Sequence, residues 1–362
     1  FLISTPLTPR SFSQATALES TKLNLGSTSL FYEFSHITLY SGATKKSSLK
    51  MAVLNSCYSQ NLAPSMAISD YPSRLSLPQT NPGVTTVLEY LIIKFPYIDA
   101  QVWRQRIAHG KVHYHDRSLV TAQSLFQPQQ RIYYYREVES EPSIPFKEEI
   151  IFQDEHVLVA YKPHFLAVTP GGIYVNECLQ NRLRLSTGIE TLQALHRLDR
   201  VTAGLVIFST NPSTRHRYHH LFQTRQIHKT YQAIANISHG ENLIGQEWQV
   251  KNRIVHSEPR FRMCVTNGEA NSHSVIRCLQ QSTQQALFEL NPVTGKTHQL
   301  RLHMEALGWP ILNDKYYPKL HPLSADNYVA PLQLLAKELQ FIDPMTQQPR
   351  CFSYGHSLSL PN

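Results

Sequence analysis

The stretch His196-Arg197-Leu198-Asp199-Arg200-Val201-Thr202-Ala203-Gly204-Leu205 decides how the rest of the chain is interpreted. It runs into Val206-Ile207-Phe208, whose β-branched and aromatic side chains predict a buried strand. Gly204 permits a close approach of another backbone beside that strand. Asp199 stands between two arginines, and a carboxylate beside cations stays ionised, which suits a nucleophile or an electrostatic anchor. A loop carboxylate in an ordinary ion pair explains the same residues equally well, so this stretch alone leaves both interpretations open.

The composition indicates a globular chain with a polyanionic partner. Its 362 residues have room for two domains, and the formal net charge is +8. No apolar run is long enough to span a bilayer. A basic charge favours a polyanion but does not separate RNA from DNA or from an acidic membrane.

The five cysteines form no CxxC pair and are widely spaced. An odd number at such spacing fits a reducing cytosol better than a disulfide framework, so we expect a cytoplasmic protein. HExxH is absent, and the pair His219-His220 lies in a basic stretch without acidic or thiolate neighbours. We therefore predict no metal site, no membrane contact and a monomer.

Residues 1–83 differ from the rest, because they are rich in Ser and Thr, poor in acids, and without a sustained helical or strand period. We interpret them as a flexible or spuriously included leader. The same composition also suits an organellar transit peptide, which remains the alternative.

A regular pattern begins near residue 84. It predicts a helix from 87 that proline stops, and a second helix over 100–109 that Asp99 caps and Gly110 ends. Two short strands follow near 111–114 and 131–136. The second helix carries Arg104 and Arg106, which suit RNA binding or form a solvated basic face on a structural cap. An acidic, proline-containing linker over 137–145 marks the boundary of the second domain.

The opening stretch resembles the HRLDxxTSGL signature of the RluA-type pseudouridine synthases, with Ala203 in place of Ser. Two further segments also resemble motifs of that family, in the family's order: Lys229-Thr230-Tyr231-Gln232-Ala233 matches K-x-Y-x-A, and residues 294–303 match TGRTHQIRVH with Lys296 for Arg. Residues 84–140 resemble, loosely, the alpha-L RNA-binding domain that precedes many such catalytic domains.

The resemblance implies an α+β fold: a mixed, mainly antiparallel sheet flanked by helices over 146–358, preceded by a small α+β RNA-binding-like domain. It implies an isomerase without cofactor or metal. Asp199 would be the catalytic residue, Tyr231 would pack on the uracil, and Arg301 would pair with Asp199, since an unpaired carboxylate in a dry pocket is costly. The predicted RNA contacts are Arg197, which would fill the gap left by the flipped base, and Arg200, Lys229, Lys296, His298, Arg104 and Arg106.

The substrate is the least determined part of this interpretation. We expect ribosomal RNA of the large subunit, because the accessory domain is typical of family members that act there, and transfer RNA is the alternative. A catalytically silent RNA-binding protein, and a hydrolase that uses Asp199 with His298, are the rivals from other classes.

Overall fold

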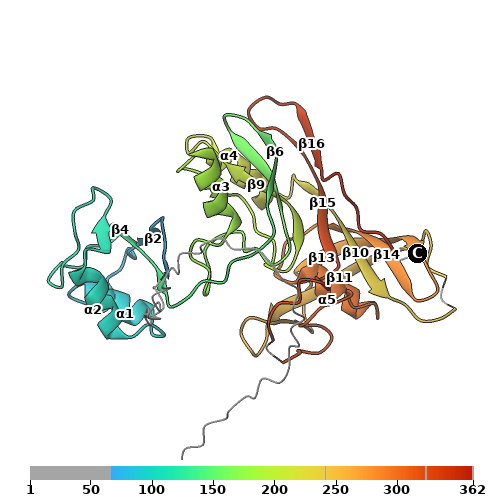
Figure 1. Cartoon of the computed structure of the whole chain (residues 1–362), viewed down its shortest axis with the longest axis horizontal. Helices are drawn as coiled ribbons and strands as arrows, with labels where there is room; N and C mark the ends of the chain where they lie inside the picture. Colours follow the sequence, from blue (N-terminus) through green and yellow to red (C-terminus); the bar gives the residue numbers. More distant parts are fainter. Residues whose placement is uncertain (1–66, 241, 323, 361–362) are drawn as a thin grey trace, which may run out of the picture. The chain divides into compact units, whose positions relative to one another are not determined.

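A computed structural model of the chain describes residues 67–240, 242–322 and 324–360 (Figure 1). Most of the predicted leader, residues 1–66, lies outside the described residues. No helix within the described residues is long and apolar enough to cross a membrane.

The two predicted N-terminal helices are confirmed. The first begins at Thr86, whose side chain accepts a hydrogen bond from the Glu89 amide while the Glu89 carboxylate accepts one from the Thr86 amide, a capping box. The first helix packs through Val87 and Leu91 in one core with the fully buried Trp103 of the second helix. The elements of this small region are β1 (Ala67–Ile68), β2 (Ser73–Ser76), α1 (Val87–Lys94), α2 (Ala100–Ala108), β3 (Val112–Tyr114), β4 (Arg131–Tyr134) and β5 (Glu137–Val138).

The predicted boundary at residue 84 is wrong. Strand β2 pairs with β4 in the sheet of the small region, and Leu77, which is 2 % exposed, belongs to its core. Because β2 reads Ser-Arg-Leu-Ser, it is too short and too polar to show a strand period in the sequence. Residues 67–83 therefore belong to the small region and not to a leader.

The second domain is built on an 11-stranded sheet in the order β12-β11-β13-β14-β10-β15-β9-β7-β6, with β16 on β15 and β8 on β9. Among the described strands of this sheet, β15 and β9 form the one parallel pair, which confirms the predicted mixed, mainly antiparallel α+β fold. Its elements are β6 (Glu149–Gln153), β7 (Val157–Lys162), α3 (Leu179–Thr187), β8 (Gln193–Ala194), β9 (Ala203–Ser209), α4 (Arg215–Gln223), β10 (His228–Asn236), β11 (Glu247–His256), β12 (Met263–Thr266), β13 (Ser272–Gln281), β14 (Gln285–Pro292), α5 (Gln299–Ala306), β15 (Leu334–Ile342) and β16 (Pro349–Ser353).

Strand β9 is buried on both faces, as its unbroken apolar run predicts. Val206 and Phe208 join the core under α3, whereas Leu205 and Ile207 join the core under α4. The alternation follows from the two-residue period of a strand. Helices therefore cover both faces of the strand that follows Asp199.

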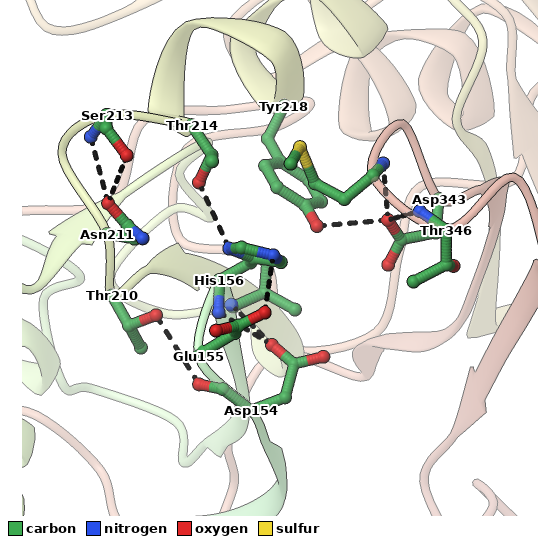
Figure 2. A network of polar contacts seen from close by, with 12 residues as sticks. Asp154, Glu155, His156, Thr210, Asn211, Ser213, Thr214, Tyr218, Asp343 and Thr346 are labelled. Carbon is green, nitrogen blue, oxygen red and sulfur yellow. Dashed lines mark hydrogen bonds and ion pairs between the residues drawn. The ribbon is translucent and has the colours of Figure 1, made fainter.

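Helix α4 is fixed by a polar network at the edge of the sheet (Figure 2). The Tyr218 hydroxyl donates to the buried carboxylate of Asp343 at 3.1 Å, and that carboxylate also accepts from the amides of Met345 and Thr346. At the start of the helix, the Thr214 hydroxyl lies 3.4 Å from Nδ1 of His156 in the β6–β7 turn. These contacts hold the basic helix against the sheet.

Gly204 is the point of closest approach between β9 and β15. Its φ is +127°, and a Cβ atom there would lie 2.3 Å from the Ala336 carbonyl oxygen. Only glycine combines that φ with that contact, so the parallel pairing of Gly204 with Ala336 depends on the missing side chain. This matches the close approach that the sequence predicts.

We predict that Gly204→Ala destabilises the domain by about 3 kcal/mol, because the new methyl group overlaps fixed backbone and the φ is unfavourable. Urea denaturation measures the change. Gly188→Ala is the matched control, since it also has a positive φ but no atom within 4 Å of the added carbon, and it should cost about 1 kcal/mol. Equal losses for the two variants would contradict the close-contact explanation.

Candidate active site

A cavity of about 880 Å³ lies where the loop before β9, strand β10 and the loop before α5 meet. Val201 and Tyr231 pack against two core clusters of the second domain, one that contains Ala336 of β15 and one that contains Leu334. The cavity therefore lies where these two cores meet. The lining residues include most of those predicted from the sequence: Arg197, Asp199, Arg200, Lys229, Tyr231, Lys296, His298 and Arg301.

Asp199 is held on a loop whose backbone is fixed from two sides. The amino group of the fully buried Lys162 donates to the carbonyl oxygens of Pro163, Leu166 and Arg200 at 2.8–3.0 Å. His196 accepts the amide hydrogen of Ile207 through Nε2, and burial lowers the pKa of its imidazole to about 3. His196 therefore acts as a neutral structural residue, and the loop presents the Asp199 carboxylate, 28 % exposed, to the cavity.

Arg301 lies between two carboxylates. Its Nε and Nη2 donate to the buried carboxylate of Asp314 at 2.7 and 2.6 Å, and its Nη1 lies 3.5 Å from Oδ2 of Asp199. Burial opposes the charge, but the hydrogen bonds and charge of Asp314, together with the charge of Asp199, raise the pKa of the guanidinium on balance. Nη1 makes no hydrogen bond to any described residue, so its hydrogens are available to a group bound beside Asp199.

Tyr231 points from β10 to the same cavity. A register shift between β10 and β15 falls at Thr230 and Tyr231, so the strand is irregular where it meets the site. Burial, and then the charge of Asp199, raise the pKa of the Tyr231 hydroxyl. Its neutral hydroxyl makes no hydrogen bond to any residue that the structure describes.

His298 lies one residue before α5, at a φ of +56°. Its Nε2 is 3.8 Å from Oδ2 of Asp199, and its Nδ1 is 2.9 Å from the Tyr317 hydroxyl. The next residue, Gln299, anchors the loop through hydrogen bonds to Thr294, Lys296, His273 and Ser274. The loop between β14 and α5 therefore holds the imidazole beside Asp199.

The predicted RNA contacts differ in their surroundings. Arg197 and Lys296 are exposed, and Arg197 makes no hydrogen bond or ion pair with any described residue. Arg200 makes a bidentate ion pair with Asp326 at 2.6 and 2.8 Å, so its charge already has a protein partner, and its contact with RNA stays a prediction.

The two arginines of α2 also differ in their exposure to solvent. Arg104 is exposed, as predicted. The prediction of an RNA contact at Arg106 is wrong, because this residue is 6 % exposed, pairs with Glu137 at 3.2 Å and stacks on Trp103.

Sequence reasoning missed the residues that position Arg301 and His298. Asp314 binds the guanidinium, Tyr316 and Tyr317 place their rings about it at 4.7 and 5.2 Å, and Gln299 fixes the loop. The signal was the segment Asn313-Asp314-Lys315-Tyr316-Tyr317, where a carboxylate and two aromatic residues follow a proline-containing turn.

The chain is similar to known RNA pseudouridine synthases. A family model described as RNA pseudouridylate synthase matches residues 156–306. A dual-specificity RNA pseudouridine synthase RluA of Haemophilus influenzae is 32% identical over 228 residues, which cover 60% of this chain and 96% of the relative. The chain belongs to the RluA-type RNA pseudouridine synthases.

Two further proteins are similar to this synthase. An RNA pseudouridine synthase of Synechocystis, itself uncharacterized, is 25% identical over 234 residues, which cover 64% of this chain and 79% of the relative. The structure of human RNA pseudouridylate synthase domain containing 1 covers 59% of this synthase and 86% of that chain, with 21% identity and a TM-score of 0.48.

We predict that Arg301→Met lowers turnover about a hundredfold or more, because it strands the carboxylates that the guanidinium faces. Arg262→Met is the control, since Arg262 lies over the same Tyr317 ring but lines no part of the cavity. Turnover of Arg301→Met close to that of the wild-type protein would show that Arg301 does not act on Asp199.

Proposed function

We propose that this RNA pseudouridine synthase acts on uridine in ribosomal RNA of the large subunit, with Asp199 as its catalytic residue. One observation carries the assignment of Asp199: among the described residues that line the cavity, it is the one carboxylate. The guanidinium of Arg301 lies 3.5 Å away and can orient the carboxylate in a site from which a bound base would exclude water.

The reaction is an isomerisation. The bond between uracil N1 and ribose C1′ breaks, C5 of the rotated base bonds to C1′, and the proton lost from C5 is balanced by one gained at N1. No net oxidation occurs. Asp199 starts the reaction, either by attack on the sugar or as a base. The neutral Tyr231 stacks on the uracil and is placed for proton transfer at C5.

The target base has to leave its helix before it can reach Asp199. Flipping a nucleotide costs a few kcal/mol, which protein contacts have to offset. Arg197 is exposed beside the cavity and without a protein partner among the described residues, so it suits the space that the flipped base leaves. Lys296 is exposed on the opposite loop and suits a backbone phosphate.

The substrate class rests on the small region. The exposed Arg104 on α2 supports a second grip on RNA outside the cavity, and phosphate contacts of that kind add affinity and register. We extend the proposal to the cytoplasm, because Cys178, Cys264, Cys278 and Cys351 are free, as in proteins of a reducing compartment. We also propose that the protein is a monomer. Transfer RNA is the second candidate, favoured if the small region takes no part in binding.

We predict that Asp199→Asn abolishes isomerisation while folding and RNA binding persist, because the change is nearly isosteric and removes the reacting charge. RNA tritiated at uracil C5 gives the readout: the wild-type protein should release tritium and leave the RNA uncleaved. Asp154→Asn is the control, since its carboxylate is 25 % exposed, close to the 28 % of Asp199, but lies outside the cavity. Cleaved RNA would indicate a hydrolase, and turnover by Asp199→Asn would exclude its role.

We predict that Arg104→Glu in the full chain weakens RNA binding and lowers the slope of log affinity against log salt by about 1, as expected for one phosphate contact. Deleting residues 1–140 should have a larger effect of the same sign, while the catalytic domain still modifies a short hairpin slowly. Binding by fluorescence anisotropy over a salt series measures both. An unchanged slope of log affinity against log salt would indicate that the small region is a structural cap that does not bind RNA.

Mapping pseudouridines in total RNA, from cells with and without the gene, identifies the substrate. Loss of a site in large-subunit ribosomal RNA is the expected result. Loss of a site in transfer RNA alone would replace the ribosomal proposal with the second candidate.

A further inference from the structure

The hydroxyl of Tyr317 determines which nitrogen of His298 carries a hydrogen. This hydroxyl donates to the Met263 carbonyl oxygen at 3.0 Å and accepts from the Met263 amide at 2.9 Å. A phenol has a single hydrogen, and the Met263 carbonyl receives it. Toward Nδ1 of His298, 2.9 Å away, the hydroxyl therefore presents a lone pair, and Nδ1 has to be the donor.

The second nitrogen of the ring is then an acceptor. Burial lowers the pKa of His298, the charge of Arg301 lowers it further, and the charge of Asp199 only partly opposes them, so the neutral imidazole is the relevant form. With its hydrogen on Nδ1, the neutral ring carries a lone pair on Nε2. No described residue donates a hydrogen bond to Nε2.

This lone pair faces the catalytic carboxylate across the cavity. Nε2 and the Asp199 Oδ2 atom are 3.8 Å apart, and both are hydrogen-bond acceptors. A group that enters this part of the cavity is stabilised at Nε2 only if it brings a donor. The backbone supports the arrangement, because His298 keeps a φ of +56° and the four hydrogen bonds of Gln299 hold the adjoining residue in place.

An internal ribonucleotide has few donors to offer. Its 3′ and 5′ oxygens are esterified, and the uracil N3–H lies on the base edge away from the sugar. The 2′-hydroxyl is the one donor on the sugar, and it is attached to the carbon next to C1′, where the glycosidic bond breaks. An acceptor within 4 Å of the carboxylate that acts at the sugar is well placed to meet it.

We propose that Nε2 of His298 accepts a hydrogen bond from the 2′-hydroxyl of the target uridine, so that His298 selects ribose over deoxyribose at that nucleotide. The inference rests on the proposed role of Asp199 at the sugar. It makes His298 a specificity-determining residue, because a 2′-deoxy nucleotide leaves the buried acceptor unpaired.

His298→Asn is the test variant. Asparagine tolerates a left-handed φ, and its side-chain amide can donate to Tyr317 as Nδ1 does, but it has no atom at the position of Nε2. The wild-type protein and the variant are each given one RNA with uridine, 2′-deoxyuridine or 2′-fluorouridine at the target position. The fluoro nucleotide keeps a ribose-like sugar pucker but has no donor, and kcat/KM for isomerisation is measured for all six combinations.

We expect the wild-type protein to lose about ten- to a hundredfold on the deoxy target relative to ribose, the penalty for an unpaired buried acceptor. His298→Asn should lose a similar factor on ribose and then separate ribose from deoxyribose by less than about threefold. The fluoro target should follow the deoxy target, with a larger penalty in the wild-type protein than in the variant. Equal penalties in the two proteins, or none in the wild-type protein, would overturn the proposal.

Two further measurements keep the test independent of the variant's folding and of the proposed function. Nitrogen NMR of ¹⁵N-histidine-labelled protein reports the tautomer, and a His298 ring with its hydrogen on Nε2 would overturn the inference. Tyr317→Phe removes the group that fixes the tautomer, so it should lower ribose selectivity as well. If the wild-type protein releases no tritium from all-ribose RNA, the proposed function fails; if it does and the penalties are equal, only the role of His298 fails.

Discussion

The site depends on one buried cation. The charge of Arg301, 2 % exposed, is compensated by Asp314, which binds two of its nitrogens, and the third nitrogen lies toward Asp199. Without Asp314 the guanidinium would have neither a fixed orientation nor compensation for the loss of water. The two tyrosines about its plane and the His298 imidazole are arranged around that charge. The geometry of the cavity thus follows from satisfying a single buried guanidinium.

The sequence predicts those parts of the structure whose hydrophobic pattern or motif residues lie within one short segment. The strand after Asp199 is a continuous apolar run, and the capped helix α1 ends before a proline, so both were predicted. Asp199, Tyr231 and Arg301 were expected together from the resemblance to a family, and the structure brings all three to one cavity. Gly204 was predicted to allow a close contact, and the contact is with Ala336.

The rest depends on partners that are distant in sequence or lie in irregular segments. Asp314 is 13 residues from Arg301 in a loop without a period, and Glu137, which removes Arg106 from the surface, is 31 residues away. Strand β2 has a polar sequence and exists through its pairing with β4. The tautomer of His298 depends on a hydroxyl and a carbonyl contributed by two other segments. Tertiary contacts of this kind leave no local pattern.

The parallel pairing of β9 with β15 also has a consequence for how the protein folds. Ala203 pairs with Leu335 and Gly204 with Ala336, so these partners are distant in sequence, whereas the antiparallel hairpins around them are local. Closing so long a loop is slow and entropically costly compared with forming a hairpin. The half that carries Asp199 and the half that carries Arg301 can each collapse beforehand, and this pairing joins them. Recovery of activity should therefore be a late event in refolding, later than most of the secondary structure.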